Sequence, residues 1–289
     1  MTTEDVRVLG TVPVPEATIR PAGRLRADLR AVEVLWKREM LRLRRNPMRL
    51  AMGLLTPLLF LIVLGTGITA AGGSGDGFRQ FRTFLFPGVL LMALQAPTVA
   101  VGVAIVWDRQ AGFLRQMLVA PVRRGAVLAG IILGGATTGA VYGGLVLTVA
   151  GVAGIPYRPS LLLVLAELAL ISAAFTALGV LAAVSFRRIE TFQMVVSLCM
   201  MPLVFLSGAI FPANGLPGWL GIAVRINPLT YVVDLLRRTL PGPDVTLGGR
   251  PSSPQWWGWV PPVGIEALGI TLIAVVALAL AARRFARSD

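Results

Sequence analysis

Long apolar runs without a basic side chain constrain this chain more than any other feature of its sequence. Six runs of 20 or more residues lack Lys and Arg, at 50–71, 84–107, 126–153, 161–186, 192–211 and 263–282. About 20 helical residues are needed to cross the ~30 Å hydrocarbon core of a bilayer. The runs therefore predict an all-α integral membrane protein with six transmembrane helices.

The basic residues are distributed unequally between the segments that connect these runs. Twenty of the 27 lie before the first run, after the second, after the fourth or after the sixth. Cytoplasmic loops of membrane proteins are enriched in Lys and Arg, so both termini are expected in the cytoplasm. The same bias accounts for the net charge of +13, and we expect no nucleic-acid partner.

The residue types that are rare or missing exclude several kinds of chemistry. The chain has no His, one Cys and one Lys, Lys37. It therefore has no Ser-His-Asp triad, no His-containing zinc site and no GxxxxGK[ST] phosphate loop. We expect a chain that is not an enzyme and binds no metal or cofactor itself.

An amphipathic helix is predicted before the first run, within a cytoplasmic N-terminal segment 1–48. Apolar residues recur at spacings of three and four, while charged residues occupy the other face: Leu29, Val32, Trp36, Met40 and Leu43. Such a helix is suited to the inner leaflet, with Trp36 at the lipid boundary and Arg side chains near anionic headgroups. The pattern leaves open whether the helix also contacts a cytosolic partner.

A short helix is predicted between the second and third runs, at residues 108–121. Asp108 is expected to cap its N-terminus and Pro121 to end it. Phe113 with Met117, and Leu114 with Leu118, form an apolar ridge beside Arg109, Gln110 and Arg115. The spacing alone does not decide between a loop that lies on lipid headgroups and a helix that docks in a groove of a soluble subunit.

Two features inside the runs remain open to interpretation. Glycine pairs four residues apart occur between Gly130 and Gly143, and they favour close helix packing within the chain or across a dimer. Glu167 is the only acid deep inside a predicted span, a possible intramembrane polar site. We favour a hydrogen bond to a neighbouring helix over a proton pathway, because no second buried ionisable group is expected nearby.

The segment 212–262 is predicted to lie outside the membrane and to contain a re-entrant helix. Asn227-Pro228 offers a turn that starts this helix, and apolar residues follow at helical spacing. The helix ends at Arg237 and Arg238, which we expect to point to outer headgroups or solvent.

Three ordered motifs resemble the type-2 ATP-binding-cassette (ABC) exporter permeases, particularly the daunorubicin-resistance-like branch. They are DRQAGFLRQMLVAP at 108–121, PLVFLSGAIFP at 202–212 followed by LPGWL at 216–220, and NPLTYVVDLLR at 227–237. The resemblance covers nearly all the chain, with a transmembrane domain at 49–286 in a bacterial cell membrane. One departure is Gln110, where relatives often carry an acid.

The resemblance implies a permease subunit that dimerises with a second copy or a paralogue and binds separate ABC ATPase subunits. Those subunits would hold ATP and Mg²⁺. The segment 108–121 would be the coupling helix, the Leu29–Leu43 stretch the connecting helix, and Asn227–Arg237 part of an outer helical cap. The cargo would be a hydrophobic or amphiphilic molecule such as a drug, an antibiotic or a lipid, moved outward.

Two other functions compete with this interpretation. An ion-coupled secondary transporter would need ionisable groups near the midplane, where Glu167 is the one candidate. A non-transporting membrane scaffold for a cytosolic complex would also use an exposed cytoplasmic helix.

Overall fold

The computed structural model describes residues 21–70, 75–111, 123–186, 188–242, 253–256 and 258–287. In this part of the chain the regular structure is helical, and the β pairing consists of one bridge between Trp256 and Trp259. The prediction of an all-α membrane protein is confirmed. In chain order the helices are α1 (Pro21–Arg45), α2 (Pro47–Ala70), α3 (Gly75–Gln110), α5 (Arg124–Leu147), the 3₁₀ helix η1 (Ala150–Ala153), α6 (Leu161–Ser185), α7 (Ile189–Phe205), α8 (Gly218–Ile226), α9 (Pro228–Thr239) and α10 (Val263–Arg287).

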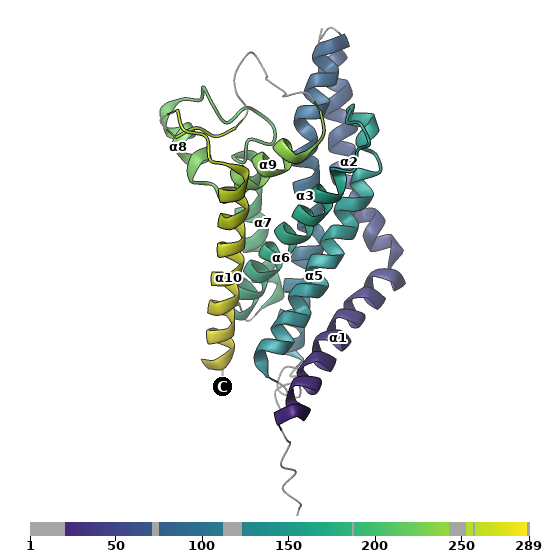
Figure 1. Cartoon of the computed structure of the whole chain (residues 1–289), viewed down its shortest axis with the longest axis vertical. Coiled ribbons are helices and arrows are strands. Elements are labelled where there is room, and N and C mark those ends of the chain that lie inside the picture. Colours follow the sequence, from purple (N-terminus) through teal and green to yellow (C-terminus); the bar gives the residue numbers. More distant parts are fainter. Residues whose placement is uncertain are drawn as a thin grey trace, which may run out of the picture.

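The long helices run side by side and leave two different ends (Figure 1). One end carries α8 and α9 and is called the cap end here. The other end carries α1 and the C-terminal end of α10, and is called the α1 end. The first helix therefore starts, and the last helix ends, on the same side of the bundle.

Helix α3 is the centre of the bundle. Its residues 84–91 are buried without interruption, and it contacts α2, α5, α6, α7 and α9. Neighbouring helices thus cover α3 on several sides, as expected of a central span.

One row of glycines on α5 receives α1. A Cβ at Gly130 would lie 2.9 Å from Leu35 Cβ, and one at Gly134 would lie 3.0 Å from Glu39 Cβ. The missing side chains thus allow the two helix backbones to approach closely.

A second row of glycines on α5 receives α6. A Cβ at Gly135 or Gly139 would overlap the side chain of Thr176 or Ser172, respectively. Ser172 Oγ donates a 2.9 Å hydrogen bond to the carbonyl oxygen of Gly135. Of the two uses left open by the sequence, these glycines serve packing within the chain.

The fifth predicted span is shorter than expected. Helix α7 has 17 residues and ends at Phe205, whereas the apolar run continues to residue 211. The chain turns at Gly208, whose φ of 71° is a conformation that favours glycine. By length and composition five helices of the described residues are suited to crossing a membrane, and the α8–α9 pair, bent by 76°, is a broken sixth candidate.

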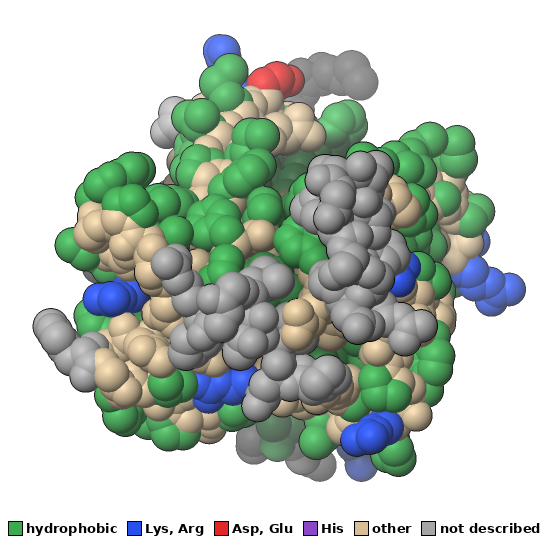
Figure 2. Space-filling model, turned by 90° about the horizontal axis from the view of Figure 1, so that it is seen from above, with side chains coloured by type: hydrophobic (Ala, Val, Ile, Leu, Met, Phe, Trp, Pro, Cys, Tyr) green, Lys and Arg blue, Asp and Glu red, His purple; other side chains and the backbone are tan. Residues whose placement is uncertain are grey.

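The outward surface of the bundle is largely apolar. Exposed large side chains line α2 and α10, among them Met52, Leu55, Leu268 and Leu272. Seen from the cap end, hydrophobic side chains form most of the visible surface and basic side chains lie apart from one another (Figure 2). Such an extensive apolar surface suits contact with lipid or with another protein.

Candidate functional site

Helix α1 packs on the bundle through most of its predicted apolar face. Val32, Trp36, Met40 and Leu43 are half-buried, whereas Leu29 remains 68% exposed. Trp36 packs partly against protein. Its indole N–H donates a 3.1 Å hydrogen bond to Thr137 of α5.

The side of α1 that is exposed in the described part of the chain mixes charged with apolar groups. Lys37 Nζ lies 2.6 Å from Glu33 Oε1, and this hydrogen bond lowers the pKa of the Glu33 carboxyl. Leu25, Val34 and Leu41 are exposed on the helix. This face remains accessible to a partner or to lipid headgroups.

The start of the predicted 108–121 helix differs from expectation. Helix α3 continues through Gln110, and the backbone N–H of Ala111 donates to the Trp107 carbonyl oxygen at 2.9 Å. Asp108 is therefore inside α3 and is not an N-cap. Backbone positions are described for Arg109 and for the exposed Gln110, while the other predicted contact residues lie outside the described residues: Gly112, Phe113, Leu114, Arg115, Met117 and Leu118.

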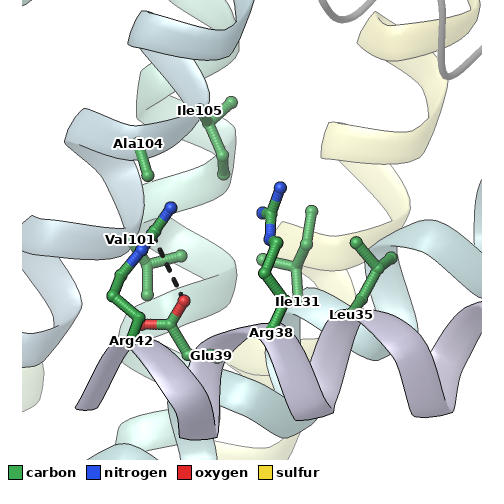
Figure 3. A pocket seen from close by; sticks show the side chains of 8 residues that line it. All are labelled: Leu35, Arg38, Glu39, Arg42, Val101, Ala104, Ile105 and Ile131. Carbon is green, nitrogen blue, oxygen red and sulfur yellow. Dashed lines mark hydrogen bonds and ion pairs between the residues drawn. The ribbon is translucent and has the colours of Figure 1, made fainter. Parts of the chain in front are cut away.

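Arg38 of α1 reaches the end of α3 that leads into this segment. Its guanidinium lies 3.7 Å from the Asp108 carboxylate. Arg38 and Arg42 both project from α1 toward α3, with Glu39 between them, around a cavity of about 20 Å³ (Figure 3). Arg42 pairs with Glu39 at 3.3 Å, so charges of both signs meet at this junction.

Asp28 of α1 reaches the other end of the segment. Its Oδ1 accepts a 3.0 Å hydrogen bond from the backbone N–H of Arg123, and its Oδ2 lies 3.7 Å from Arg123 Nε. We call the pairs Asp28–Arg123 and Arg38–Asp108 the α1 clamp. Helix α1 thus contacts the chain on both sides of residues 112–122.

The α1 clamp is not evident in the sequence pattern. Asp28 and Arg38 lie ten residues apart in an Arg-rich helix, about 15 Å along its axis. An acid among many basic residues was a possible signal, but its partner is 95 residues away. Sequence spacing reports contacts within a helix, not between distant helices.

An apolar cavity of about 210 Å³ lies between α3, α6 and α7. Its polar lining comes from Gln95 and Thr98, and its exposed side includes Cys199 of α7. The other lining side chains are apolar, including Phe175, Leu178, Phe186, Phe192 and Met200. An apolar wall with few polar groups is typical of a site for small hydrophobic ligands.

Glu167 makes the predicted hydrogen bond to a neighbouring helix, but the expectation that no other buried ionisable group lies in this region is wrong. Thr239 Oγ1 of α9 donates to Glu167 Oε1 at 2.7 Å. Asp234 of α9 and Glu266 of α10 are buried, whereas Glu167 is half-buried. Buried ionisable groups therefore gather at the cap end, although they are far apart in the sequence.

The re-entrant helix starts as predicted but directs its basic residues differently. Asn227 Oδ1 caps α9 by accepting a 3.0 Å hydrogen bond from Leu229 N–H. Arg237 turns inward, donates to the Gly208 carbonyl oxygen at 2.9 Å and stacks 4.3 Å from the Phe84 ring centroid. Arg238 donates to the Pro261 carbonyl oxygen at 2.7 Å. The basic end of α9 thus fastens the cap instead of facing headgroups.

The ABC-2 type transporter family matches residues 30–240. The daunorubicin resistance ABC transporter permease protein DrrB1 of Streptomyces coeruleorubidus is 30% identical over 257 residues, covering 84% of this chain and 88% of that protein.

Two further relatives show a similar match. The putative transport permease ycf38 of Cyanophora paradoxa is 29% identical over 208 residues, covering 71% of this chain and 72% of its own. Nodulation protein J of Rhizobium leguminosarum bv. trifolii is 28% identical over 214 residues, covering 73% and 81%, respectively.

Proposed function

The chain belongs to the ABC-2 type transporter family and is a transport permease subunit, and from this premise we propose that it exports a hydrophobic or amphiphilic molecule. Export would be driven by separate ABC ATPase subunits that bind ATP and Mg²⁺. The α1 clamp carries the proposal, because it joins the connecting helix to both ends of the predicted coupling segment. We expect the chain in a bacterial cell membrane, with the α1 end in the cytoplasm.

The clamp suggests how movement of an ATPase subunit reaches the bundle. A subunit that binds residues 112–118 would pull on the ends of α3 and α5. Asp108 lies in α3, and Arg123 directly precedes α5. Because Arg38 and Asp28 bind these same residues, α1 would move with them. A nucleotide-dependent shift of one docked segment would then bias the whole bundle between two states.

The apolar cavity supports the proposed class of cargo. Its aromatic and aliphatic walls favour hydrophobic molecules through burial of apolar surface, at ~25 cal/mol per Å². A sugar or an ion would lose hydration there without equivalent hydrogen bonds. A drug, an antibiotic or a lipid therefore fits this lining best, and the name of the daunorubicin resistance relative agrees with that class.

A second permease copy would complete the cavity. Met194, Leu198 and Met201 form an exposed apolar face on α7, next to the side where Cys199 borders the cavity. Packing two such faces around a shared path would bury these side chains and enclose the cargo. A paralogue with a similar α7 would serve equally.

The docking proposal is tested with Phe113→Glu and Leu114→Glu. A charge on the predicted ridge would be buried against the ATPase subunit, so we expect loss of co-purification with that subunit. Gly125→Glu, at an exposed position of α5 with open space around it, is the control and should co-purify normally. Unchanged co-purification of both ridge variants would refute docking through this segment.

The transport proposal is tested in sealed vesicles. We expect efflux of a hydrophobic dye only when the ATPase subunit and ATP are both present. Efflux that persists without the ATPase subunit would support an ion-coupled secondary transporter instead. Binding of the ATPase subunit without any transport of hydrophobic probes would support the scaffold.

A further inference from the structure

A small polar pocket lies where α1 meets α2. Arg42 of α1 and Arg49 of α2 line it together with Thr138 and Tyr142 of α5, and the cavity measures about 20 Å³. The hydroxyl of Tyr142 donates a 3.4 Å hydrogen bond to the carbonyl oxygen of Arg49, so the start of α2 is joined to α5 here. A cavity of this size accepts a water molecule or a single oxygen atom of a larger group.

Thr138 brings a polar group to this pocket that no described residue satisfies. It is only 4% exposed, and its Oγ1 has no hydrogen-bond partner in the described part of the chain. A threonine hydroxyl inside a helix often donates to a carbonyl oxygen of the preceding turn, as Thr137 does to Leu133 and Gly134. Thr138 Oγ1 is therefore available to donate to a ligand.

The charges at this pocket leave an excess of positive charge. Glu39 also lines the pocket, but it lies 3.3 Å from Arg42, so these two charges offset each other (Figure 3). Arg49 is exposed and forms no ion pair with a described residue. Arg45 is also exposed, and it follows Arg42 by three residues, which places both on the same side of α1. An anion is the ligand that these arginines favour.

An exposed apolar stripe begins on α2 beside Arg49. Its members recur at spacings of four and three and are 47–63% exposed: Met48, Met52, Leu55 and Leu59. Gly53 marks the side of α2 that faces the pocket, because a Cβ there would lie 2.7 Å from the Tyr142 ring. Arg49 precedes Gly53 by four residues and Met52 by three, so it lies between the pocket and the stripe. An anion bound at Arg49 could therefore extend an apolar tail along α2.

We propose that this pocket binds the phosphate of an anionic phospholipid, whose acyl chains lie along the apolar stripe of α2. The lipid belongs to the leaflet in which α2 begins. One phosphate oxygen enters the cavity and accepts a hydrogen bond from Thr138, while Arg42 and Arg49 bind the other oxygens. A free phosphate ion would gain nothing from the stripe, because it carries no apolar chain. The site is separate from the proposed transport activity, since it needs neither the ATPase subunit nor cargo.

Binding is measured by native mass spectrometry of the full chain purified in detergent. The probes are phosphatidylglycerol and phosphatidylcholine with identical acyl chains. We expect phosphatidylglycerol to bind several-fold more tightly, because the choline group cancels the charge of the phosphate. Arg49→Gln should weaken phosphatidylglycerol binding about fivefold, the contribution of one arginine near anionic lipid, and leave phosphatidylcholine binding unchanged. Equal binding of the two lipids by the unaltered chain would overturn the site.

Arg30→Gln is the matched control for diffuse attraction between charges. Arg30 is exposed on α1 and lies 12 residues before Arg42, away from the pocket. Its replacement removes the same charge and should leave the affinity for phosphatidylglycerol close to that of the unaltered chain. If Arg30→Gln and Arg49→Gln weaken binding equally, the lipid is attracted by the overall charge and no site exists.

Thr138→Val tests the hydroxyl inside the cavity. Valine keeps the shape of threonine but cannot donate a hydrogen bond, so the affinity for phosphatidylglycerol should fall several-fold, and Thr138→Ser should recover it. Thermal unfolding in detergent without added lipid establishes that each variant is folded. Unchanged affinity in Thr138→Val would show that the cavity holds water only and would refute the proposed phosphate contact.

Competition with inorganic phosphate distinguishes a lipid from a free anion. Because the acyl chains contribute to binding, we expect millimolar inorganic phosphate to leave bound phosphatidylglycerol in place. Phosphatidylglycerol with six-carbon chains should bind more weakly than the long-chain lipid. Displacement by inorganic phosphate, or equal affinity for short and long chains, would assign the pocket to a free anion and overturn the lipid proposal.

Discussion

Gly139 illustrates how one missing side chain sets the distance between two helices. Ser172 of α6 occupies the space where a Cβ would project from α5. Ser172 is fully buried, and its hydroxyl donates across the same interface to Gly135. Close approach and an interhelical hydrogen bond therefore depend on the same two glycines.

Gly139→Ala is expected to destabilise the bundle by about 1–3 kcal/mol, because the new methyl group overlaps Ser172. Gly125→Ala adds the same methyl group to α5 in open space and serves as the control. The measurement is the thermal unfolding midpoint of each purified variant in detergent. Equal midpoints for the two variants would contradict the packing role of Gly139.

Glu167→Gln is expected to leave transport largely unchanged. The amide oxygen still accepts the hydrogen bond from Thr239, so the contact between α6 and α9 persists. The measurement is the rate of dye efflux from vesicles across a range of pH. A variant that loses a pH dependence seen in the wild type would show that Glu167 itself carries a proton during transport.

Helix α1 shows how an element gains a role from its position. Its amphipathic pattern suits a membrane surface, but one face lies on α5 and its ionic groups hold the ends of α3 and α5. Exposed ion pairs contribute only about 0–1 kcal/mol each. The clamp is therefore expected to add little to overall stability.

Arg38→Asp is expected to reduce ATP-driven transport, because it places two acids together at the end of α3. Adding Asp108→Arg restores opposite charges in the exchanged order and should recover most of the rate. The comparison uses vesicles containing the ATPase subunit, with Glu33→Gln on the free face of α1 as the control. Failure of the double variant to improve on Arg38→Asp would argue against the ion pair as a link.

At the scale of the whole molecule, the two ends of the bundle are chemically different. The cap end is fastened by inward hydrogen bonds from Arg237 and Arg238. The α1 end gathers basic residues of α1 at the ends of α3 and α5. This asymmetry supports one orientation in the membrane.

Val34→Cys and Trp259→Cys test that orientation in the Cys199→Ala background. Both positions are exposed, on α1 and at the cap end respectively. In intact cells an impermeant maleimide should label Trp259→Cys, whereas Val34→Cys should react only after permeabilisation. Labelling of Val34→Cys in intact cells would place the α1 end outside.

The sequence alone determined the class of fold and the approximate spans. The reason is local: the bilayer fixes the length of an apolar helix, so hydropathy along the chain identifies the spans. The Asn227 cap was predictable for the same reason, because an Asn side chain binds the backbone two residues on. The early end of α7 was not predictable from the local sequence. It depends on a turn at Gly208, whose carbonyl oxygen accepts a hydrogen bond from Arg237.

Only the tertiary structure decided which side chains meet across the bundle. Glu167, Asp234 and Glu266 lie in three separate helices, and the α1 clamp joins α1 to α3 and to Arg123, which directly precedes α5. The periodicity of one helix states which face is apolar, but not which residue of a distant helix covers it. The burial of Arg237 and Asp234 depends on such contacts. Hydropathy along the chain does not identify the neighbours that make them.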